Sequence, residues 1–288
     1  MTSRRKKHGK VNKILREAWK ILLSVIIIVA GFVMIFPFLW MISASFKGIN
    51  DVFEFPIRWI PNPITTKGYE LLFSGKVPFL VFYKNSIIVA VLGLAGTFFS
   101  CTMAGYAYAK INFVGRDKIF LLKLSTTMIP SMVTILPTFM IYSKLGLINT
   151  RTALWLPWTF GGAMGVFIMR QFFVSLPNEL VEAARIDGAS HPRIYWNIAI
   201  PSARPAISTL LFLYFISIWN DYERPLLYLR NRELFTLPFA VKYFADDQFQ
   251  NYPAIMAANV CMLIPIIILF FVAQKSFVRS IITTGIKG

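Results

Sequence analysis

The chain has 288 residues, of which 56% are hydrophobic and only 15% are charged, and its mean hydropathy is +0.60. A soluble domain has about 25% charged residues, so this composition excludes a disordered chain and argues against an ordinary soluble globule. The net charge of +17 suggests a nucleic-acid-binding protein at first sight. The basic residues, however, gather at the ends of apolar segments rather than along one face.

Six apolar segments are long enough to cross a membrane, because about 20 apolar residues span a hydrocarbon core of about 30 Å as a helix. Internal prolines, such as Pro37, Pro130, Pro137 and Pro265, are compatible with this, since neighbouring helices satisfy the backbone groups that proline frees. The sequence therefore predicts an all-α integral membrane protein with six transmembrane helices. The expected spans are 21–46, 86–109, 124–143, 153–169, 205–220 and 252–274.

The predicted organisation is one six-helix membrane domain over 21–277, between a basic arm at 1–20 and a tail at 278–288. The first span is much longer than the apolar region of about 7–15 residues in a signal peptide, so we expect it to remain uncleaved. The basic arm is expected either to touch anionic lipid headgroups or to lie solvated as a plain tail.

The distribution of basic residues predicts the orientation. Of the 30 Lys and Arg residues, eighteen lie on the side that carries both termini and eleven on the opposite side, and Lys123 falls near a span boundary. Because cytoplasmic loops carry the excess of Lys and Arg, both termini are predicted to be cytoplasmic. This orientation accounts for the basic charge, and we expect no nucleic-acid partner.

No catalytic or metal-binding pattern is present in the sequence. It contains no phosphate-binding loop of the Gly-x-x-x-x-Gly-Lys-Ser/Thr type, no His-Glu-x-x-His and no Gly-x-Ser-x-Gly. The two cysteines, Cys101 and Cys261, lie in apolar runs and read as small buried side chains. We therefore predict no catalytic residue, no metal site and no cofactor in this chain. The spans also lack the acidic residues of a proton-driven pump.

The loop at about 171–204 carries the most distinctive pattern. Asn178 is expected to cap a short amphipathic helix, with Glu179 and Glu182 in its first turns, and Gly188 to end it. A second short helix is expected from Arg193 to a stop at Pro201. From the residues alone, a partner-binding element and a connector lying on the membrane surface are equally good interpretations.

This loop resembles the signature loop of bacterial ABC importer permeases. Glu182-Ala183-Ala184 is followed after three residues by Gly188 and, after nine more, by Ile198-Ala199-Ile200-Pro201, where the family pattern has Leu in place of Ile200. Further stretches are similar to sugar-importer permeases, and in particular to the smaller permease of the maltose type. These are 219–222 with Pro225-Leu226, the first-span segment 37–47, and the tail 274–288.

The resemblance implies a type I ABC importer permease fold in a bacterial cell membrane. It implies a helix at about 179–188 that couples the chain to a cytoplasmic ATPase, with Lys287 and Gly288 as further candidate contacts. The implied partners are a homologous second permease, an ATPase dimer that binds ATP and Mg, an extracellular solute-binding protein, membrane lipid and a sugar substrate. The implied ATPase-coupling residues are Glu179, Glu182, Ala183, Ala184, Arg185, Asp187, Gly188 and Pro201.

The outer loop at about 225–252 would meet the binding protein. Its aromatic residues suit a protein interface or a sugar-stacking surface, and a small core of the loop's own explains them almost as well. They are Phe235, Phe239, Tyr243, Phe244 and Phe249.

Substrate contacts are expected from polar and aromatic residues in or near the spans, although hydrogen bonding between helices explains each of them as well. The candidates are Tyr106, Thr126, Tyr214, Trp219, Asn220 and Asn259. The predicted function is thus a permease subunit of an ATP-driven importer of a sugar or oligosaccharide. A permease for glycerol phosphate or a polyol is the alternative, followed by a secondary carrier.

Overall fold

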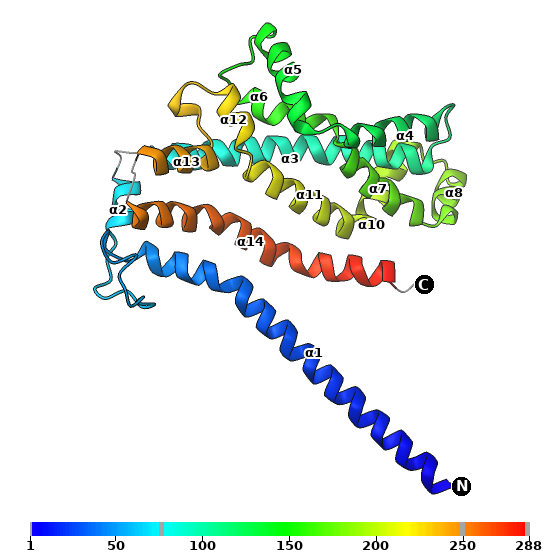
Figure 1. Ribbon diagram of the computed structural model, residues 1–288. Coiled ribbons are helices and arrows are strands. Elements are labelled where there is room, and N and C mark those ends of the chain that lie inside the picture. The colour runs from blue at the N-terminus through cyan, green and yellow to red at the C-terminus, as the bar shows by residue number, and fades with distance from the viewer. Residues whose placement is uncertain (1, 75–77, 248–250, 286–288) are drawn as a thin grey trace. The chain divides into compact units, whose positions relative to one another are not determined.

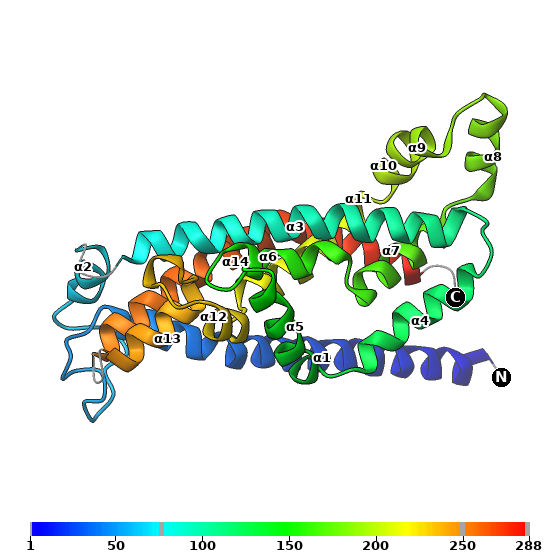
Figure 2. The same ribbon diagram turned by 90° about the horizontal axis from the view of Figure 1, so that it is seen from above.

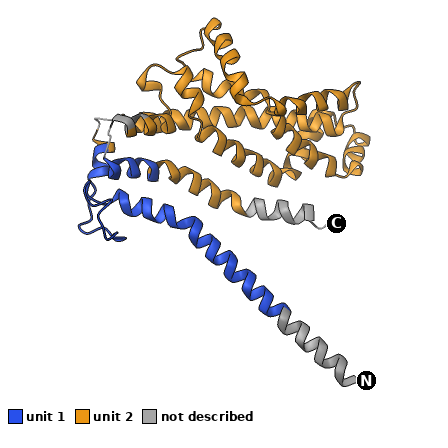
Figure 3. Cartoon of the chain, viewed as in Figure 1, with its two compact units in different colours: residues 1–71, 249–260 blue, residues 72–248, 261–288 orange. Residues whose placement is uncertain are grey.

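The computed structural model describes residues 2–74, 78–247 and 251–285, and the side chains of this set outside 2–15, 243, 244, 246, 247 and 275–285. The described residues form helices and connecting turns, without a strand (Figure 1). The predictions for five residues fall outside the described side chains: Tyr243, Phe244, Phe249, Lys287 and Gly288. The chain divides into two compact units, coloured separately in Figure 3: residues 1–71 with 249–260, and residues 72–248 with 261–288.

The helices follow one another with short breaks. They are α1 (Thr2–Ser45), α2 (Lys67–Phe73), α3 (Phe79–Lys110), α4 (Arg116–Ser125), η1 (Thr126–Met128), α5 (Ser131–Lys144), α6 (Thr152–Trp155), η2 (Leu156–Phe160), α7 (Ala163–Ser175), α8 (Asn178–Ile186), α9 (His191–Ile194), η3 (Tyr195–Ala199), α10 (Ile200–Ser202), α11 (Arg204–Trp219), α12 (Glu223–Tyr228), η4 (Arg232–Leu234), α13 (Leu237–Asp247) and α14 (Tyr252–Gly285).

Four stretches are each long and apolar enough to cross a membrane: Arg16–Ser45, Phe79–Lys110, Thr152–Ser175 (which consists of α6, η2 and α7) and Tyr252–Gln274. Two bent pairs bring the number to six if each pair is one span. The six-span, all-α prediction is therefore confirmed.

The third predicted span is not the straight helix expected over 124–143. Arg116–Met128 and Ser131–Lys144 meet at an angle of 100°. The break falls at Ile129, whose backbone is extended (φ −83°, ψ 115°), directly before Pro130. A residue that precedes proline is disfavoured in the helical region. Pro37, Pro137 and Pro265, in contrast, lie inside continuous helices.

In the first unit, the end of α1 is joined to α2 and to the following loop. The hydroxyls of Ser45 and Tyr69 lie 2.9 Å apart, and Thr65 donates to the carbonyl of Lys47 at 3.0 Å. The ring of Phe53 packs edge-on against Tyr252 with centroids 4.7 Å apart. Most of the large side chains of α1 are exposed, as in a helix surrounded by lipid.

In the second unit, α3 is the central helix, and η2, α7 and α11 pack along it (Figure 1). α7 packs closely against α3 at Gly165, where a Cβ would come within 2.6 Å of Cys101 Sγ. Gly105 of α3 meets α7 in the same way, because a Cβ there would lie 2.6 Å from Met169 Cβ. Such small residues let two helix backbones approach. Both cysteines are buried free thiols, as predicted.

Candidate functional site

The candidate coupling loop, residues 171–204, stands apart from the rest of its unit near the C-terminal end of α3 (Figure 2). Its first helix, α8, ends in a left-handed glycine: Gly188 has φ +79°. The Ala189 amide donates to the Ala184 carbonyl at 2.9 Å, and the Gly188 amide donates to Arg185 at 3.0 Å. This pair of bonds is a Schellman motif. Gly188 therefore ends the helix as predicted.

The start of α8 differs from the prediction. Asn178 does not cap the helix but is its first residue, after Pro177, and its side chain bonds to α3 instead. Lys110 Nζ donates to Asn178 Oδ1 and to the Leu176 carbonyl, both at 2.6 Å. A fixed proline φ is compatible with the position before a helix, and the cation takes the side-chain oxygen that would otherwise accept from the helix amides. Lys110 thus joins the end of α3 to the start of α8.

Most of the predicted coupling residues lie together on the exposed surface of α8. Only Val181 of this helix is buried, and Ala184 is half-buried. Ile186, although apolar, is 88% exposed. The exposed predicted residues are Glu179, Glu182, Ala183, Arg185, Asp187 and Gly188, while Pro201 is exposed on the separate segment α10.

The second helix of the loop is longer than predicted. It begins at His191 rather than Arg193, and it passes through Pro201 to Ser202 before it bends by 78° into α11. Pro192 lies in its first turn, where a missing amide hydrogen costs nothing. The π-helical turn Tyr195–Ala199 precedes Pro201, and its wider spacing relieves the contact between the proline ring and the turn before it.

An aromatic cluster packs the loop against α3. The Tyr106 ring lies 5.8 Å from Phe173 and 5.4 Å from Tyr195, measured between centroids. The Tyr195 and Thr102 hydroxyls lie 2.7 Å apart. Because the Thr102 hydrogen is donated to the Phe98 carbonyl, Tyr195 is the donor of this bond. The hydroxyl of Tyr106 and Nδ1 of His191 are buried without a hydrogen-bond partner in the described residues.

The predicted substrate residues are spread over the structure rather than gathered in one cavity. Tyr106 is 3% exposed in the aromatic cluster, and Trp219 is 2% exposed, with its indole donating to the Met262 carbonyl at 3.1 Å. Tyr214 is half-buried and accepts from the Gly165 amide at 3.1 Å. The remaining three, Thr126, Asn220 and Asn259, donate to carbonyls of their own helices.

The outer-loop aromatics that are described serve a local core. Phe235 and Phe239 are 7% and 8% exposed, and their ring centroids lie 4.4 Å apart. The interface role expected for these two residues is therefore wrong, and the alternative of a folded loop is correct. Phe235 also stacks on Phe82 of α3.

A half-buried ion pair near the end of α11 was missed at the level of sequence. Arg224 Nη1 lies 3.0 Å from Asp221 Oδ2, and the guanidinium lies 4.6 Å from the centroid of Trp158. Burial raises the pKa of Asp221, and the neighbouring Arg224 opposes this effect. The i, i+3 spacing of the two residues was the available signal.

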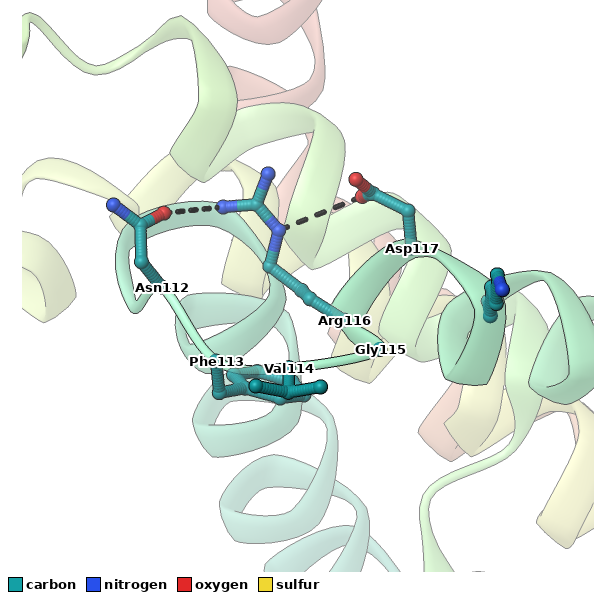
Figure 4. A pocket seen from close by; sticks show the side chains of 7 residues that line it. Asn112, Phe113, Val114, Gly115, Arg116 and Asp117 are labelled. Carbon is teal, nitrogen blue, oxygen red and sulfur yellow. Dashed lines mark hydrogen bonds and ion pairs between the residues drawn. The ribbon is translucent and has the colours of Figure 1, made fainter.

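A second missed set joins the C-terminal end of α3 and the start of α4 to α7. Arg170 approaches Asp117 at 3.3 Å and lies 4.2 Å from the ring centroid of Phe120. The α3–α4 connection beside it lines an open pocket of about 430 Å³ over residues 112–118. Figure 4 shows Arg116 between Asn112 and Asp117 there, at 2.9 Å and 3.5 Å. The pocket contains none of the predicted substrate residues. The described side chains contain no group of three His, Cys, Asp or Glu that could hold a metal.

Comparisons with a family model and with individual proteins both identify this chain as similar to membrane components of transport systems. Residues 96–283 match the family described as binding-protein-dependent transport system inner membrane component. The chain is 33% identical, over 90% of its length and 93% of the relative, to the arabinooligosaccharides transport system permease protein AraQ of Halalkalibacterium halodurans. It is 29% identical, over 93% and 97%, to the sn-glycerol-3-phosphate transport system permease protein UgpE of Yersinia pestis bv. Antiqua.

Among solved structures, the chain resembles one from a bacterial ABC transporter involved in the import of the acidic polysaccharide alginate. The TM-score is 0.79 at 26% identity, with 91% of this chain and 97% of the other covered.

Proposed function

Because the chain belongs to the family of binding-protein-dependent transport system inner membrane components, we propose that it is one permease subunit of an ATP-driven importer for a sugar or oligosaccharide. It is a multi-pass membrane protein and a transporter subunit rather than an enzyme. In this role it forms half of the translocation path and couples to an ATPase through the loop of Glu182, Ala183, Ala184 and Gly188.

The observation that carries the coupling role is the exposed helix α8. It projects from the membrane-spanning helices, it is anchored by Lys110, and it presents Ile186 with 88% of its surface exposed. A short helix with acidic, small and apolar exposed residues suits a groove on a partner protein. A connector lying on the membrane would instead turn Leu180 and Ile186 into lipid and leave its acidic residues in solution.

The energy for transport comes from the partner. The sequence has no phosphate-binding loop, so ATP and Mg bind to an ATPase dimer in this proposal. Closure of that dimer moves α8, and the two permeases change between inward-facing and outward-facing states. A nucleotide drives this exchange only through its different affinity for the two states.

The remaining subunits follow from the family. The proposed assembly contains a homologous second permease, the ATPase dimer and a solute-binding protein on the outer face. Both termini lie in the cytoplasm, as the excess of Lys and Arg on their side indicates. The ATPase then meets α8 on the same side as the termini.

The substrate class has one close alternative. Relatives include permeases named for arabinooligosaccharides and for sn-glycerol-3-phosphate, so a glycerol phosphate or polyol importer is the second candidate. A secondary carrier is the third, and it would need no ATPase.

The decisive experiment is affinity purification of the tagged chain from native membranes in mild detergent, followed by mass spectrometry. We expect a second permease and an ATPase to copurify, and the genomically associated binding protein to be identified and screened against sugars and glycerol phosphate. A chain that is natively expressed but purifies alone, or only with copies of itself, would contradict the proposal and favour a secondary carrier.

A further inference from the structure

The fourth span is interrupted inside the membrane. Its first part, η2, ends at Phe160, Gly161 adopts a left-handed conformation (φ +65°), and α7 begins only at Ala163. The interruption frees backbone carbonyls that have no partner in their own helix. Thr97 of α3 donates to the Trp158 carbonyl at 3.1 Å, and Lys123 of α4 donates to the Phe160 carbonyl at 3.4 Å.

The position of this contact is well inside the hydrocarbon layer. A Cβ on Gly161 would lie 3.1 Å from Ser100 Oγ, so the break lies beside the middle of α3. Ser100 is ten residues before Lys110, or about 15 Å along the helix at 1.5 Å per residue. The hydrocarbon core is about 30 Å thick, so by helix length the Lys123 ammonium group lies well inside the apolar layer.

No acidic side chain compensates this charge. Among the described residues, Lys123 has no ion pair, and the only acidic residues in the candidate spans are Glu17 and Asp117, near their ends. The contact with the Phe160 carbonyl is a long hydrogen bond that occupies one of three ammonium hydrogens. Lys123 is half-buried, so the rest of the group is open to the surroundings of the chain.

Those surroundings cannot be lipid. A lysine within the lipid-exposed part of a membrane helix is strongly disfavoured, and intramembrane cations accordingly face protein or a water-filled cavity. The ammonium group is bonded to the Phe160 carbonyl at this depth, so the four-carbon stem of Lys123 does not carry it to the membrane surface.

We propose that Lys123 lines the water-filled translocation path and attracts a negatively charged group of the transported substrate there, so that this importer favours an acidic sugar over a neutral one. The inference rests on the proposed function and specifies its substrate class. The broken span supplies the path with polar backbone, and Lys123 supplies its positive charge. Thr126 and Phe160, both exposed, lie on the same part of the surface.

The test measures water access and local charge in the assembled importer. In a background with Cys101→Ala and Cys261→Ala, a single Thr126→Cys lies one turn from Lys123. It is treated in membranes with two thiosulfonate reagents of similar size, one carrying a sulfonate and the other a quaternary ammonium. We expect the anionic reagent to react faster relative to its intrinsic rate, and Lys123→Met to lower this preference at least about tenfold.

Leu121→Cys is the matched control, because this position is 63% exposed on the opposite side of α4. We expect it to stay unreactive to both reagents. No reaction at Thr126→Cys, or a charge preference unchanged by Lys123→Met, would overturn the inference. Copurification of the ATPase with Lys123→Met checks assembly, so that failure of this inference remains distinct from failure of the proposed function.

Discussion

The ammonium nitrogen of Lys110 lies 2.6 Å from the side-chain oxygen of Asn178, which links the last residue of α3 to the first residue of α8. A second bond of the same length joins Lys110 to the Leu176 carbonyl. These two bonds connect α8 directly to the central helix of the second unit. We infer that this link, rather than the loop backbone alone, carries force from a docked ATPase to the spans.

Loss of the Lys110 anchor should uncouple ATP hydrolysis from transport. We expect Lys110→Met to lower transport about tenfold, because each hydrogen bond to a charged group contributes about 1.5–3 kcal/mol. The measurement is transport into proteoliposomes that contain the whole importer, alongside its ATPase rate. Lys118→Met, an exposed lysine on the neighbouring α4, should leave both rates unchanged. Equal effects of the two variants would refute the anchoring role.

Different substitutions at Gly188 should distinguish the effect of backbone strain from the effect of a side chain that blocks the partner protein. A Cβ at this position meets nothing within 4 Å inside the chain, so a side chain here is strained only through its positive φ. We expect Gly188→Asn to be nearly neutral and Gly188→Ala to cost about 1 kcal/mol. Gly188→Arg should abolish coupling while the protein remains in the membrane, since a long side chain obstructs the partner.

Copurification of the ATPase with each Gly188 variant, compared at equal membrane levels, provides the measurement. Normal transport by well-expressed Gly188→Arg would mean that the turn does not face the ATPase.

The buried bond between Tyr195 and Thr102 should respond asymmetrically to its two deletions. Tyr195→Phe leaves Thr102 bonded to the Phe98 carbonyl, so we expect a loss of about 1 kcal/mol. Thr102→Val leaves the Tyr195 hydroxyl buried without a partner and should cost about 2 kcal/mol. Thermal unfolding of both single variants and of the double variant gives their coupling. Equal losses that simply add would argue against the bond.

The pair of Asp221 and Arg224 should make stability depend on pH. Burial raises the pKa of Asp221 on folding, so its contribution is fully present below the ordinary carboxyl value of 3.8 and is lost as the pH rises through the folded value. Arg224 limits that loss. We therefore expect Arg224→Met to cost about 2 kcal/mol at pH 7 and clearly less at pH 4.

Melting temperatures of the purified importer at the two pH values test this expectation. The double variant Arg224→Met with Asp221→Asn should show no such difference between pH 7 and pH 4. A Tm loss from Arg224→Met that is the same at both values would show that the ionised carboxylate does not depend on Arg224.

The sequence predicted that the helix ends at Gly188 because the signal is local. A glycine adopts the positive φ that ends a helix without help from distant residues. The sequence prediction failed at Asn178, where a helix cap also seemed to depend on local residues alone. The side-chain oxygen of Asn178 is instead bonded by Lys110, which is 68 residues away in the sequence. The prediction also failed at Pro130, since Pro37, Pro137 and Pro265 also lie inside predicted spans and stay within continuous helices, whereas the helix breaks before Pro130. Which proline breaks a helix depends on neighbours that can satisfy the freed backbone.

By itself, the sequence determined the membrane class, the number of spans and the helix that ends at Gly188. Hydrophobic length and residue spacing are read along the chain, and lipid imposes helices wherever the chain crosses it. Only the tertiary structure decided that Phe235 and Phe239 form a core, that Arg224 is paired with Asp221, and that Lys123 meets the break at Phe160. These outcomes depend on burial and on contacts between distant helices, and burial determines whether a charge or a ring is structural or available to a ligand.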